Sequence, residues 1–330
     1  MVTKGCLHMI GFLRPALICF IAWGVQTLPC HGAVRLDRLG RLLTTKGYGG
    51  AELVDSGKFY HLPIRAEGTA GHLVVDTGSS GTLIFRSSVN RLGLNETRTR
   101  EYVRGAFGPT QERYGLAMIH SFLAGNCTVR NVPVAIASDL AASQSYGRPN
   151  GLLGLRELMK FGAVLDLSRR MLYLRPGRPD QELADDIRSI MESGGWKAVS
   201  LTFARNHLRV PGEANDVPCH FLVDTGAYRT VLDRSFAAEA NIATRPTSVI
   251  AHGVGGASGT VQLANLSSLW IGDYQIRSAT ASVLAMDNHM LGRGTPAEVV
   301  GLIGLEYLAL NSAVFDFVSG TLYLRPRSRP

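Results

Sequence analysis

The chain has 330 residues, of which 45% are apolar and 18% are charged, and its formal net charge is +8. This length and composition suffice for one large core or two modest ones, and they exclude a mainly disordered chain. The basic surplus favours anionic surroundings. However, no basic tract with interleaved aromatic residues occurs, so we expect no nucleic-acid partner.

The first 33 residues have the pattern of an export signal. Lys4 and Arg14 supply positive charge, a mostly apolar run covers residues 16 to 25, and residues 30 to 33 include small side chains that suit a cleavage site. We therefore expect a signal peptide over residues 1–33 and a periplasmic or secreted protein. An uncleaved anchor and an apolar first helix are the alternatives, and a membrane partner is expected only if the segment stays uncleaved.

Cysteine and histidine usage gives little support for other structural or chemical centres. Outside the first 33 residues the chain has only Cys127 and Cys219, which allow one disulfide and exclude a disulfide framework. No Cys-x-x-Cys or His-Glu-x-x-His motif occurs, and the nine histidines are scattered. We therefore predict no metal site and no cofactor.

Most of the remaining chain is an internal repeat, which predicts the architecture. The triplet Asp-Thr-Gly occurs at 76–78 and again at 224–226, 148 residues later, each time directly after an apolar run. The sequence Gly-Leu-x-Gly follows each copy, at 151–154 and at 301–304, 150 residues apart. The two halves therefore differ by a net insertion of two residues between these motifs.

Each half is predicted to begin with a short amphipathic helix. Apolar residues spaced by three and four precede a glycine in both halves. The aligned residues are Leu36, Leu39, Leu42 and Leu43 before Gly47, and Ala184, Ile187, Ile190 and Met191 before Gly195. Because residues 34–50 have this counterpart in the middle of the chain, we interpret them as part of the fold and not as an inhibitory pro-segment.

Short, glycine-punctuated antiparallel strands are predicted to follow each helix, and each half should close with a β-hairpin. The hairpins are expected over residues 164–174 and 314–324, where Asp166 and Asp316 should have structural roles beside the turns. The polar stretch 176–182 is the best candidate for a linker. This organisation gives two lobes, residues 34–177 and 178–330.

Two lone carboxylates, each at the end of a buried strand, suit the hydrolysis of a peptide bond. A catalyst must take a proton from water and give one to the carbonyl oxygen, and two acids that share one proton can do both. A pseudo-twofold axis brings the same loop of each half to one point. Asp76 and Asp224 are therefore expected to meet on that axis.

The residues that follow each aspartate suit such a meeting of loops. Gly78 and Gly226 allow each loop to turn tightly beside the other. The hydroxyls of Thr77 and Thr225 are placed to form hydrogen bonds across the axis. Rigid loops of this kind would hold the two acids in a fixed geometry.

The sequences Val-Asp-Thr-Gly-Ser-Ser and Val-Asp-Thr-Gly-Ala, each followed by Gly-Leu-(Leu/Ile)-Gly, resemble the aspartic peptidases, the clan of pepsins and retroviral proteases. The resemblance covers about residues 35 to 326. The chain as a whole is similar to retropepsin-like proteins with two tandem units. It implies a mostly β fold of two pseudo-twofold-related, acid-protease-like β-barrel lobes, each with short helices. It also implies an aspartic endopeptidase that acts on peptide or protein substrates.

The resemblance assigns roles to residues at the motif positions. Asp76 and Asp224 become the catalytic dyad, and Thr77 and Thr225 become the interlocking threonines. The Gly-Leu-x-Gly segments become strands packed beneath the active loops. Since one chain supplies both acids, we expect a monomer that contains an intramolecular pseudo-dimer.

Two departures from the family pattern affect the expected chemistry. Pepsins have Ser or Thr after both triplets, whereas here Ser79 follows the first and Ala227 the second. A hydroxyl that stabilises its neighbouring carboxylate would make Asp76 the more readily ionised acid and Asp224 the more often protonated one, with a less acidic optimum than that of a pepsin. Tyr228 replaces an acid that binds the substrate backbone in retroviral enzymes, so substrate contacts there are expected to differ.

Two glycine-rich segments at equivalent positions are candidate flaps that would close over a substrate. The first contains Gly105 and Phe107, and the second contains Gly253 and Gly255. Plain surface turns are the alternative interpretation of both segments.

Three other functions fit parts of the sequence. A non-catalytic peptide-binding module of the same fold would keep the same motifs. A dinucleotide-binding loop would use residues 253–259, but it requires a following helix, and residues 258–261 are a poor helix start. A serine hydrolase would use Ser79 or Ser80, but the Gly-x-Ser-x-Gly spacing is absent.

Overall fold

Short β-strands dominate the protein in a computed structural model, which describes residues 37–105, 108–139, 148–177, 181–252, 258–276 and 279–325. The predicted mostly β fold with a few short helices is confirmed. All described residues belong to one compact unit, residues 37–330, and the predicted signal peptide lies outside them. Within the described part of the chain, no helix has the length and apolar character needed to cross a membrane.

The first half is built around an eight-stranded sheet. Its elements, in chain order, are α1 (Arg38–Thr45), β1 (Gly49–Glu52), β2 (Val54–Asp55), β3 (Tyr60–Ala66), β4 (Thr69–Val75), β5 (Leu83–Phe85), η1 (Arg86–Ser88), β6 (Thr97–Gly105), β7 (Gly108–Ala124), β8 (Cys127–Ala137), β9 (Gly151–Leu153), α2 (Leu155–Lys160), β10 (Val164–Asp166) and β11 (Met171–Leu174). The strand order of the sheet is β2-β3-β4-β9-β5-β8-β7-β6.

The second half repeats this plan. Its elements are α3 (Gln181–Ser193), β12 (Lys197–Ser200), β13 (Thr202–Ala204), β14 (His207–Ala214), β15 (Val217–Val223), β16 (Val231–Asp233), α4 (Arg234–Glu239), β17 (Thr244–His252), β18 (Ser258–Asn265), β19 (Leu269–Ile271), β20 (Tyr274–Gln275), β21 (Thr280–Leu284), α5 (Asn288–Leu291), β22 (Gly301–Ile303), α6 (Leu305–Leu310), β23 (Val314–Asp316) and β24 (Thr321–Leu324). Its sheet has the order β17-β18-β21-β16-β22-β15-β14-β19-β20, and β13 pairs with β14.

A six-stranded sheet joins the halves, in the order β1-β11-β10-β23-β24-β12. At its centre β10 and β23 run antiparallel, with Leu165 opposite Phe315. These two residues are counterparts in the repeat, 150 positions apart. The two residue pairs that flank them are also counterparts of each other. A pseudo-twofold axis therefore passes through the Leu165–Phe315 pair, as in an isologous dimer contact.

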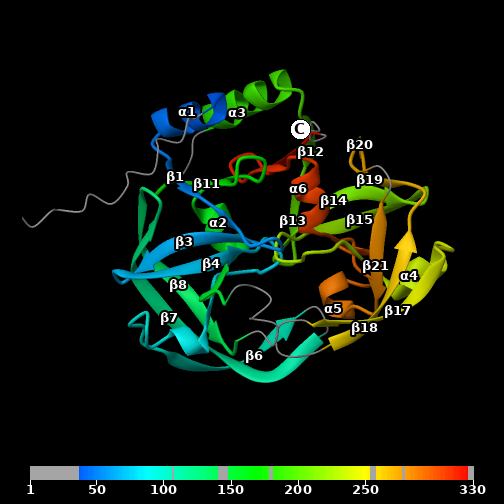
Figure 1. Cartoon of the computed structure of the whole chain (residues 1–330), viewed down its shortest axis with the longest axis horizontal. Coiled ribbons are helices and arrows are strands. Elements are labelled where there is room, and N and C mark those ends of the chain that lie inside the picture. The colour runs from blue at the N-terminus through cyan, green and yellow to red at the C-terminus, as the bar shows by residue number, and fades with distance from the viewer. Residues whose placement is uncertain are drawn as a thin grey trace, which may run out of the picture. The chain divides into compact units, whose positions relative to one another are not determined.

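Helices α1 and α3 lie side by side along this sheet, as Figure 1 shows. Buried residues of both helices pack with apolar side chains of the sheet strands: Leu39, Leu43, Ile187, Met191, Val164, Tyr173, Val314 and Tyr323. The hydrogen bonds are symmetric too, since the Tyr48 hydroxyl donates to the Gly162 carbonyl and the Trp196 indole N–H to the Ser312 carbonyl, both at 3.0 Å. Residues 37–50 are therefore part of the fold, as predicted.

The closing hairpins β10–β11 and β23–β24 lie where the repeat predicted them. The Asp166 carboxylate accepts hydrogen bonds from the Ser168 hydroxyl at 2.6 Å and from the Arg169 backbone N–H at 3.0 Å. Asp316 accepts one from the Val318 backbone N–H at 2.8 Å. Both aspartates thus stabilise turns, which confirms the structural role expected of them.

The two cysteines outside the first 33 residues do not form the disulfide that the sequence allowed. Cys127 lies on β8 of the first half and Cys219 on β15 of the second, and both are free. Burial raises the pKa of both thiols, that of Cys219 to about 12. Both cysteines therefore carry protonated, unreactive thiols at neutral pH.

Candidate active site

Two buried strands deliver the two aspartates to one place. Strand β4 ends at Val75, and the Asp76 backbone N–H donates to the Leu153 carbonyl at 3.0 Å. In the second half, the Asp224 backbone N–H donates to the Ile303 carbonyl at the same distance. Leu153 and Ile303 belong to β9 and β22, which are the strands of the two Gly-Leu-x-Gly motifs. Each motif therefore fixes the point at which its aspartate leaves the sheet.

The two carboxyl groups lie close together across the pseudo-twofold axis, near enough for each to affect the pKa of the other. A Cβ atom placed on Gly78 would lie 2.3 Å from the Asp224 carboxyl carbon, and one placed on Gly226 would lie 2.3 Å from that of Asp76. Real Cβ atoms do not approach other atoms so closely. Each glycine is therefore required for the contact between its own loop and the acid of the other half.

Four hydrogen bonds between the threonines and the opposite loops lock the site. The Thr77 hydroxyl donates to the Val223 carbonyl at 2.7 Å, and the Thr225 hydroxyl donates to the Val75 carbonyl at 2.7 Å. Each hydroxyl also accepts from the backbone N–H of the other threonine, at 3.1 and 3.0 Å. Both side chains are buried, so water does not compete for these bonds. The hydrogen bonds expected across the axis are present.

Backbone N–H groups orient each carboxylate. Oδ1 of Asp76 accepts from the N–H groups of Gly78 and Ser79 at 2.9 and 3.0 Å. Oδ1 of Asp224 accepts from those of Gly226 and Ala227 at 2.8 and 3.1 Å. These hydrogen bonds hold both acids in place. Asp224 is 9% exposed and Asp76 is partly exposed, so the pair can still be reached from outside.

Burial and mutual repulsion set the acidity of the pair. Burial is the largest influence on both groups and raises the pKa of each. The negative charge of Asp224 raises the pKa of Asp76 further, to well above its usual value. Backbone N–H groups oppose this rise at both acids, because those of Ser79 and Gly78 favour the charged form of Asp76 and those of Gly226 and Ala227 favour that of Asp224. The pair is therefore placed to hold one proton between its two carboxyl groups.

The sequence analysis expected Asp76 to be the more readily ionised acid, but the structure does not contain the hydrogen bond on which that expectation rests. The expectation assumed that the Ser79 hydroxyl stabilises the Asp76 carboxylate. The hydroxyl instead donates to the Gly81 carbonyl at 2.9 Å, whereas the bond to Asp76 comes from the Ser79 backbone. Ala227 supplies the same backbone N–H, so the side-chain difference does not give the two acids different donors.

Two glutamates that the sequence analysis missed support the loops, Glu157, which is buried, and Glu306, which is half-buried. Glu157 accepts hydrogen bonds from the backbone N–H and the hydroxyl of Thr82, at 2.8 and 2.7 Å. Glu306 accepts one from the backbone N–H of Thr230 at 2.5 Å. The threonines are equivalent in the repeat, but the glutamates are not, since Glu157 comes three residues after its motif glycine and Glu306 two. Because of this difference in position, alignment of the two halves does not pair the two glutamates.

The described strands on either side of the candidate flaps pair as equivalent antiparallel hairpins, β6–β7 and β17–β18, which lie on the side of the molecule away from α1 and α3 (Figure 1). Gly105 lies opposite Gly108 near the tip of the first hairpin. Phe107, Gly253 and Gly255 lie outside the described residues. The first hairpin also contacts the second half, because Arg104 pairs with Asp287 at 3.2 Å.

Two of the alternative functions find no counterpart in this geometry. Residues 258–265 form strand β18 of a hairpin and not the helix that a dinucleotide-binding loop requires. The Ser79 hydroxyl is bonded to a carbonyl, as described above. Tyr228 is 38% exposed, and the Arg229 guanidinium stacks on its ring at 5.3 Å.

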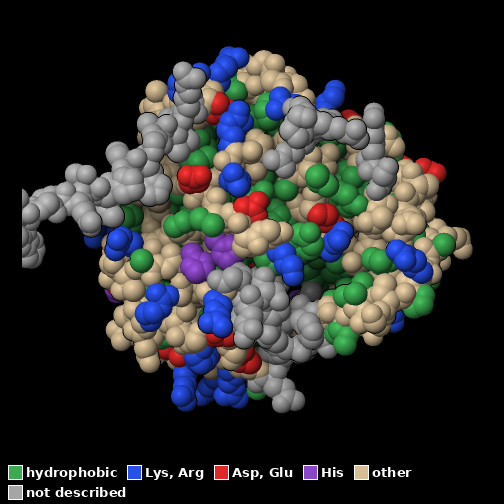
Figure 2. All heavy atoms as spheres, viewed as in Figure 1, with side chains coloured by type: hydrophobic (Ala, Val, Ile, Leu, Met, Phe, Trp, Pro, Cys, Tyr) green, Lys and Arg blue, Asp and Glu red, His purple; other side chains and the backbone are tan. Residues whose placement is uncertain are grey.

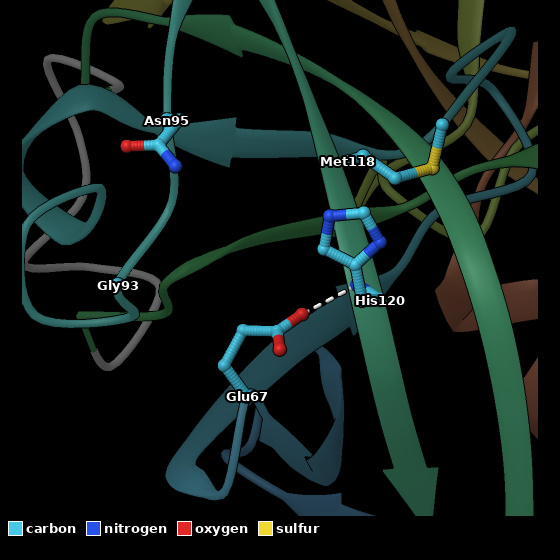
Figure 3. A pocket seen from close by; sticks show the side chains of 5 residues that line it. All are labelled: Glu67, Gly93, Asn95, Met118 and His120. Carbon is cyan, nitrogen blue, oxygen red and sulfur yellow. Dashed lines mark hydrogen bonds between the residues drawn. The ribbon is translucent and has the colours of Figure 1, made fainter.

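A separate shallow pocket lies on the first half, and Figure 3 shows the side chains that line it: Glu67, Gly93, Asn95, Met118 and His120. The Glu67 carboxylate accepts a hydrogen bond from the His120 backbone N–H, so this acid is already engaged. Neither aspartate of the pair lines this pocket. We therefore place the candidate active site at the aspartate pair.

Two equivalent lobes that meet at paired Asp-Thr-Gly loops define the class of acid-protease-like proteins. A model of the aspartyl protease family matches residues 62–156 and 210–307, one region in each half. The matched regions include both triplets and both Gly-Leu-x-Gly motifs and cover more than half of the chain. The chain therefore belongs to the aspartyl protease family, with two tandem retropepsin-like units. No curated protein matches it.

Proposed function

We propose that this protein is an aspartic endopeptidase in which Asp76 and Asp224 activate a water molecule for attack on a peptide bond. The observation that carries the proposal is the close approach of the two carboxyl groups, which come from equivalent loops and each pack against the glycine of the other loop. Family membership supports aspartic peptidase activity in general. The substrate would be a peptide or a protein.

The proposed reaction uses the two acids in different protonation states. The ionised acid takes a proton from water as the water oxygen bonds to the carbonyl carbon, and the protonated acid gives its proton to the carbonyl oxygen. When the tetrahedral intermediate collapses, the C–N bond breaks and the leaving amine takes up a proton from the pair. The hydroxyl bonds of Thr77 and Thr225 would keep both acids in place during these transfers.

The same proposal includes the state and location of the protein. Both acids come from one chain, so the active form is a monomer that needs no second copy to complete its site. Residues 1–33 would act as an export signal, which gives a periplasmic or secreted enzyme. The lobes would extend over residues 34–177 and 178–330.

Cleavage of a peptide library by the wild-type, Asp76→Asn and Asp224→Asn proteins tests the dyad. Each substitution keeps the size of the side chain and removes the carboxyl chemistry, so turnover should fall about a hundredfold to ten-thousandfold. Asp166→Asn is the matched control, because it removes a buried carboxylate that only stabilises a turn. The folded control protein should still cleave peptides.

The possible results separate the proposal from its main alternative. Turnover that survives both active-site substitutions would contradict the dyad. A folded wild-type protein that binds library peptides and cleaves none across the pH range would instead be an inactive peptide-binding module of the same fold.

A further inference from the structure

Basic side chains are spread over the protein surface, as Figure 2 shows for one face, and one group of them includes a histidine that approaches the Gly78 backbone. This group consists of Arg205 in the turn before β14, His207 and Arg209 at the start of β14, and His289 on α5. Arg205 and Asn206 both have positive φ angles, 51° and 66°, and form the tight turn between β13 and β14. The turn exposes Arg205 and brings His207 back toward the loop of the first half.

His207 connects the group to the dyad loop. Its ring lies within hydrogen-bonding reach of the Gly78 backbone, and Gly78 in turn packs against the Asp224 carboxyl. Burial lowers the pKa of His207, as do the nearby Arg205 and His289. The Nδ1 atom of the ring is buried and has no hydrogen-bond partner. Buried polar atoms without a partner are rare in folded proteins, so this nitrogen indicates a site at which a ligand supplies the missing hydrogen bond.

The charge of the group is not neutralised by an acid. The Arg205 guanidinium lies 3.1 Å from Nδ1 of His289 and 3.4 Å from the His289 carbonyl. Arg209 donates to the Pro296 carbonyl at 2.5 Å. Among the described residues, none of these side chains forms an ion pair.

The acid nearest in sequence is already engaged elsewhere. Asp287, at the start of α5, pairs with Arg104 at 3.2 Å and accepts a hydrogen bond from the Met290 backbone N–H at 3.1 Å. It therefore fixes α5 to the hairpin β6–β7 and leaves Arg205 and His289 without a carboxylate. A guanidinium that contacts only uncharged atoms and has no carboxylate partner is suited to bind a carboxylate.

We propose that Arg205 and His289 form a subsite for an acidic side chain of the substrate, with His207 as the residue that positions this subsite next to the dyad. The inference rests on the proposed function and adds a substrate class to it, namely peptides with Asp or Glu close to the scissile bond. Arg205 supplies paired N–H donors that match a carboxylate. Its exposure allows the substrate to reach it.

The test uses a positional-scanning hexapeptide library with wild-type, Arg205→Gln and Arg205→Glu proteins. The wild type should prefer Asp and Glu over Asn and Gln at one position by about tenfold, the usual size of a charge-assisted hydrogen bond. Arg205→Gln should remove the preference, and Arg205→Glu should replace it with a preference for Lys and Arg. Arg130→Glu is the control, because Arg130 is equally exposed on β8 of the other half and should leave the profile unchanged.

Affinity selection of the same library on immobilised Asp224→Asn protein, with and without Arg205→Glu, provides a readout that does not depend on turnover. Enrichment of acidic peptides that disappears with Arg205→Glu supports the subsite. If the wild type also cleaves no peptide, that absence of cleavage overturns only the proposed function. Cleavage or binding without an acidic preference, or a preference that survives both Arg205 substitutions, overturns the subsite. Thermal melts of all variants show whether they are folded.

Discussion

Ser79 and Ala227 occupy equivalent positions, yet their chemical difference does not reach the aspartates. The Ser79 hydroxyl follows the turn of its loop and meets the Gly81 carbonyl. A serine at 227 would meet the equivalent carbonyl, that of Arg229, if its loop kept the same conformation. What acts on each carboxylate is the backbone N–H, which every residue except proline supplies.

We therefore expect Ser79→Ala and Ala227→Ser to leave the pH profile of kcat/KM unshifted. The active pair must carry one proton, and because the pKa of both acids is raised, that proton is kept to higher pH and activity should extend toward neutrality. Profiles of the three proteins with one peptide provide the measurement. A shift of one unit in either variant, worth about 1.4 kcal/mol, would show that the hydroxyl does act on the acids.

At the scale of elements, the ends of β4 and β15 are joined through Thr77 and Thr225. Replacing Thr77 with valine keeps its shape but leaves the Val223 carbonyl and the Thr225 N–H without their partners. The free energy of unfolding should fall by about 1–3 kcal/mol, the cost of a buried unpaired polar group. Turnover should fall as well, because the loops that hold the acids loosen.

Thr77→Ser is the matched variant, since it removes only a methyl group and retains the hydroxyl. It should lose much less stability in urea denaturation than Thr77→Val does. Equal losses in the two variants would mean that packing of the methyl group, and not the hydrogen bonds, stabilises the loops.

The elements that the sequence predicted are those with a local signal that occurs twice. The spacing of Leu39 and Leu43 predicted α1, and the apolar run before Asp76 predicted the end of β4. The contact of the two loops followed from the repeat, because equal units tend to associate about a twofold axis. These local signals and the repeat together were sufficient to predict the fold and the position of the aspartate pair.

Features that depend on side chains from distant segments could not be predicted in this way. Glu157 and Glu306 support equivalent threonines from different positions, so alignment of the halves separates them. Arg104 and Asp287 are 183 residues apart, and each alone resembles an ordinary surface charge. The direction of the Ser79 hydroxyl depends on the loop conformation, which residue type does not determine.

For the whole molecule, His61 should limit stability in acid. It is 4% exposed, and burial, with a smaller contribution from His72, lowers its pKa to about 4 from a usual 6.5. Between these two values the unfolded chain binds a proton that the folded protein does not, so stability should decline as pH falls from about 6.5 to about 4. The buried dyad acts in the opposite direction, because its raised pKa values favour the folded state in acid.

His61→Gln removes this titration, and its unfolding free energy should therefore fall less from pH 7 to pH 4.5 than that of the wild type. Chemical denaturation at the two pH values provides the comparison. His120→Gln, at an exposed histidine, is the control. An identical change in the wild type and in His61→Gln would show that other groups govern acid stability.

The axis through Leu165 and Phe315 has a consequence for how a bound peptide is oriented. In a dimer of identical chains every substitution occurs twice, so the two ends of an extended peptide meet the same surface and either orientation fits equally well. Here the halves are joined in one chain and have diverged, so that the counterpart of His207 is the buried Phe59. On the proposed function, a peptide laid across the axis would meet the imidazole of His207 and the guanidinium of Arg205 on one side and no such pair at the matching place on the other, and it would therefore bind with a preferred N-to-C direction.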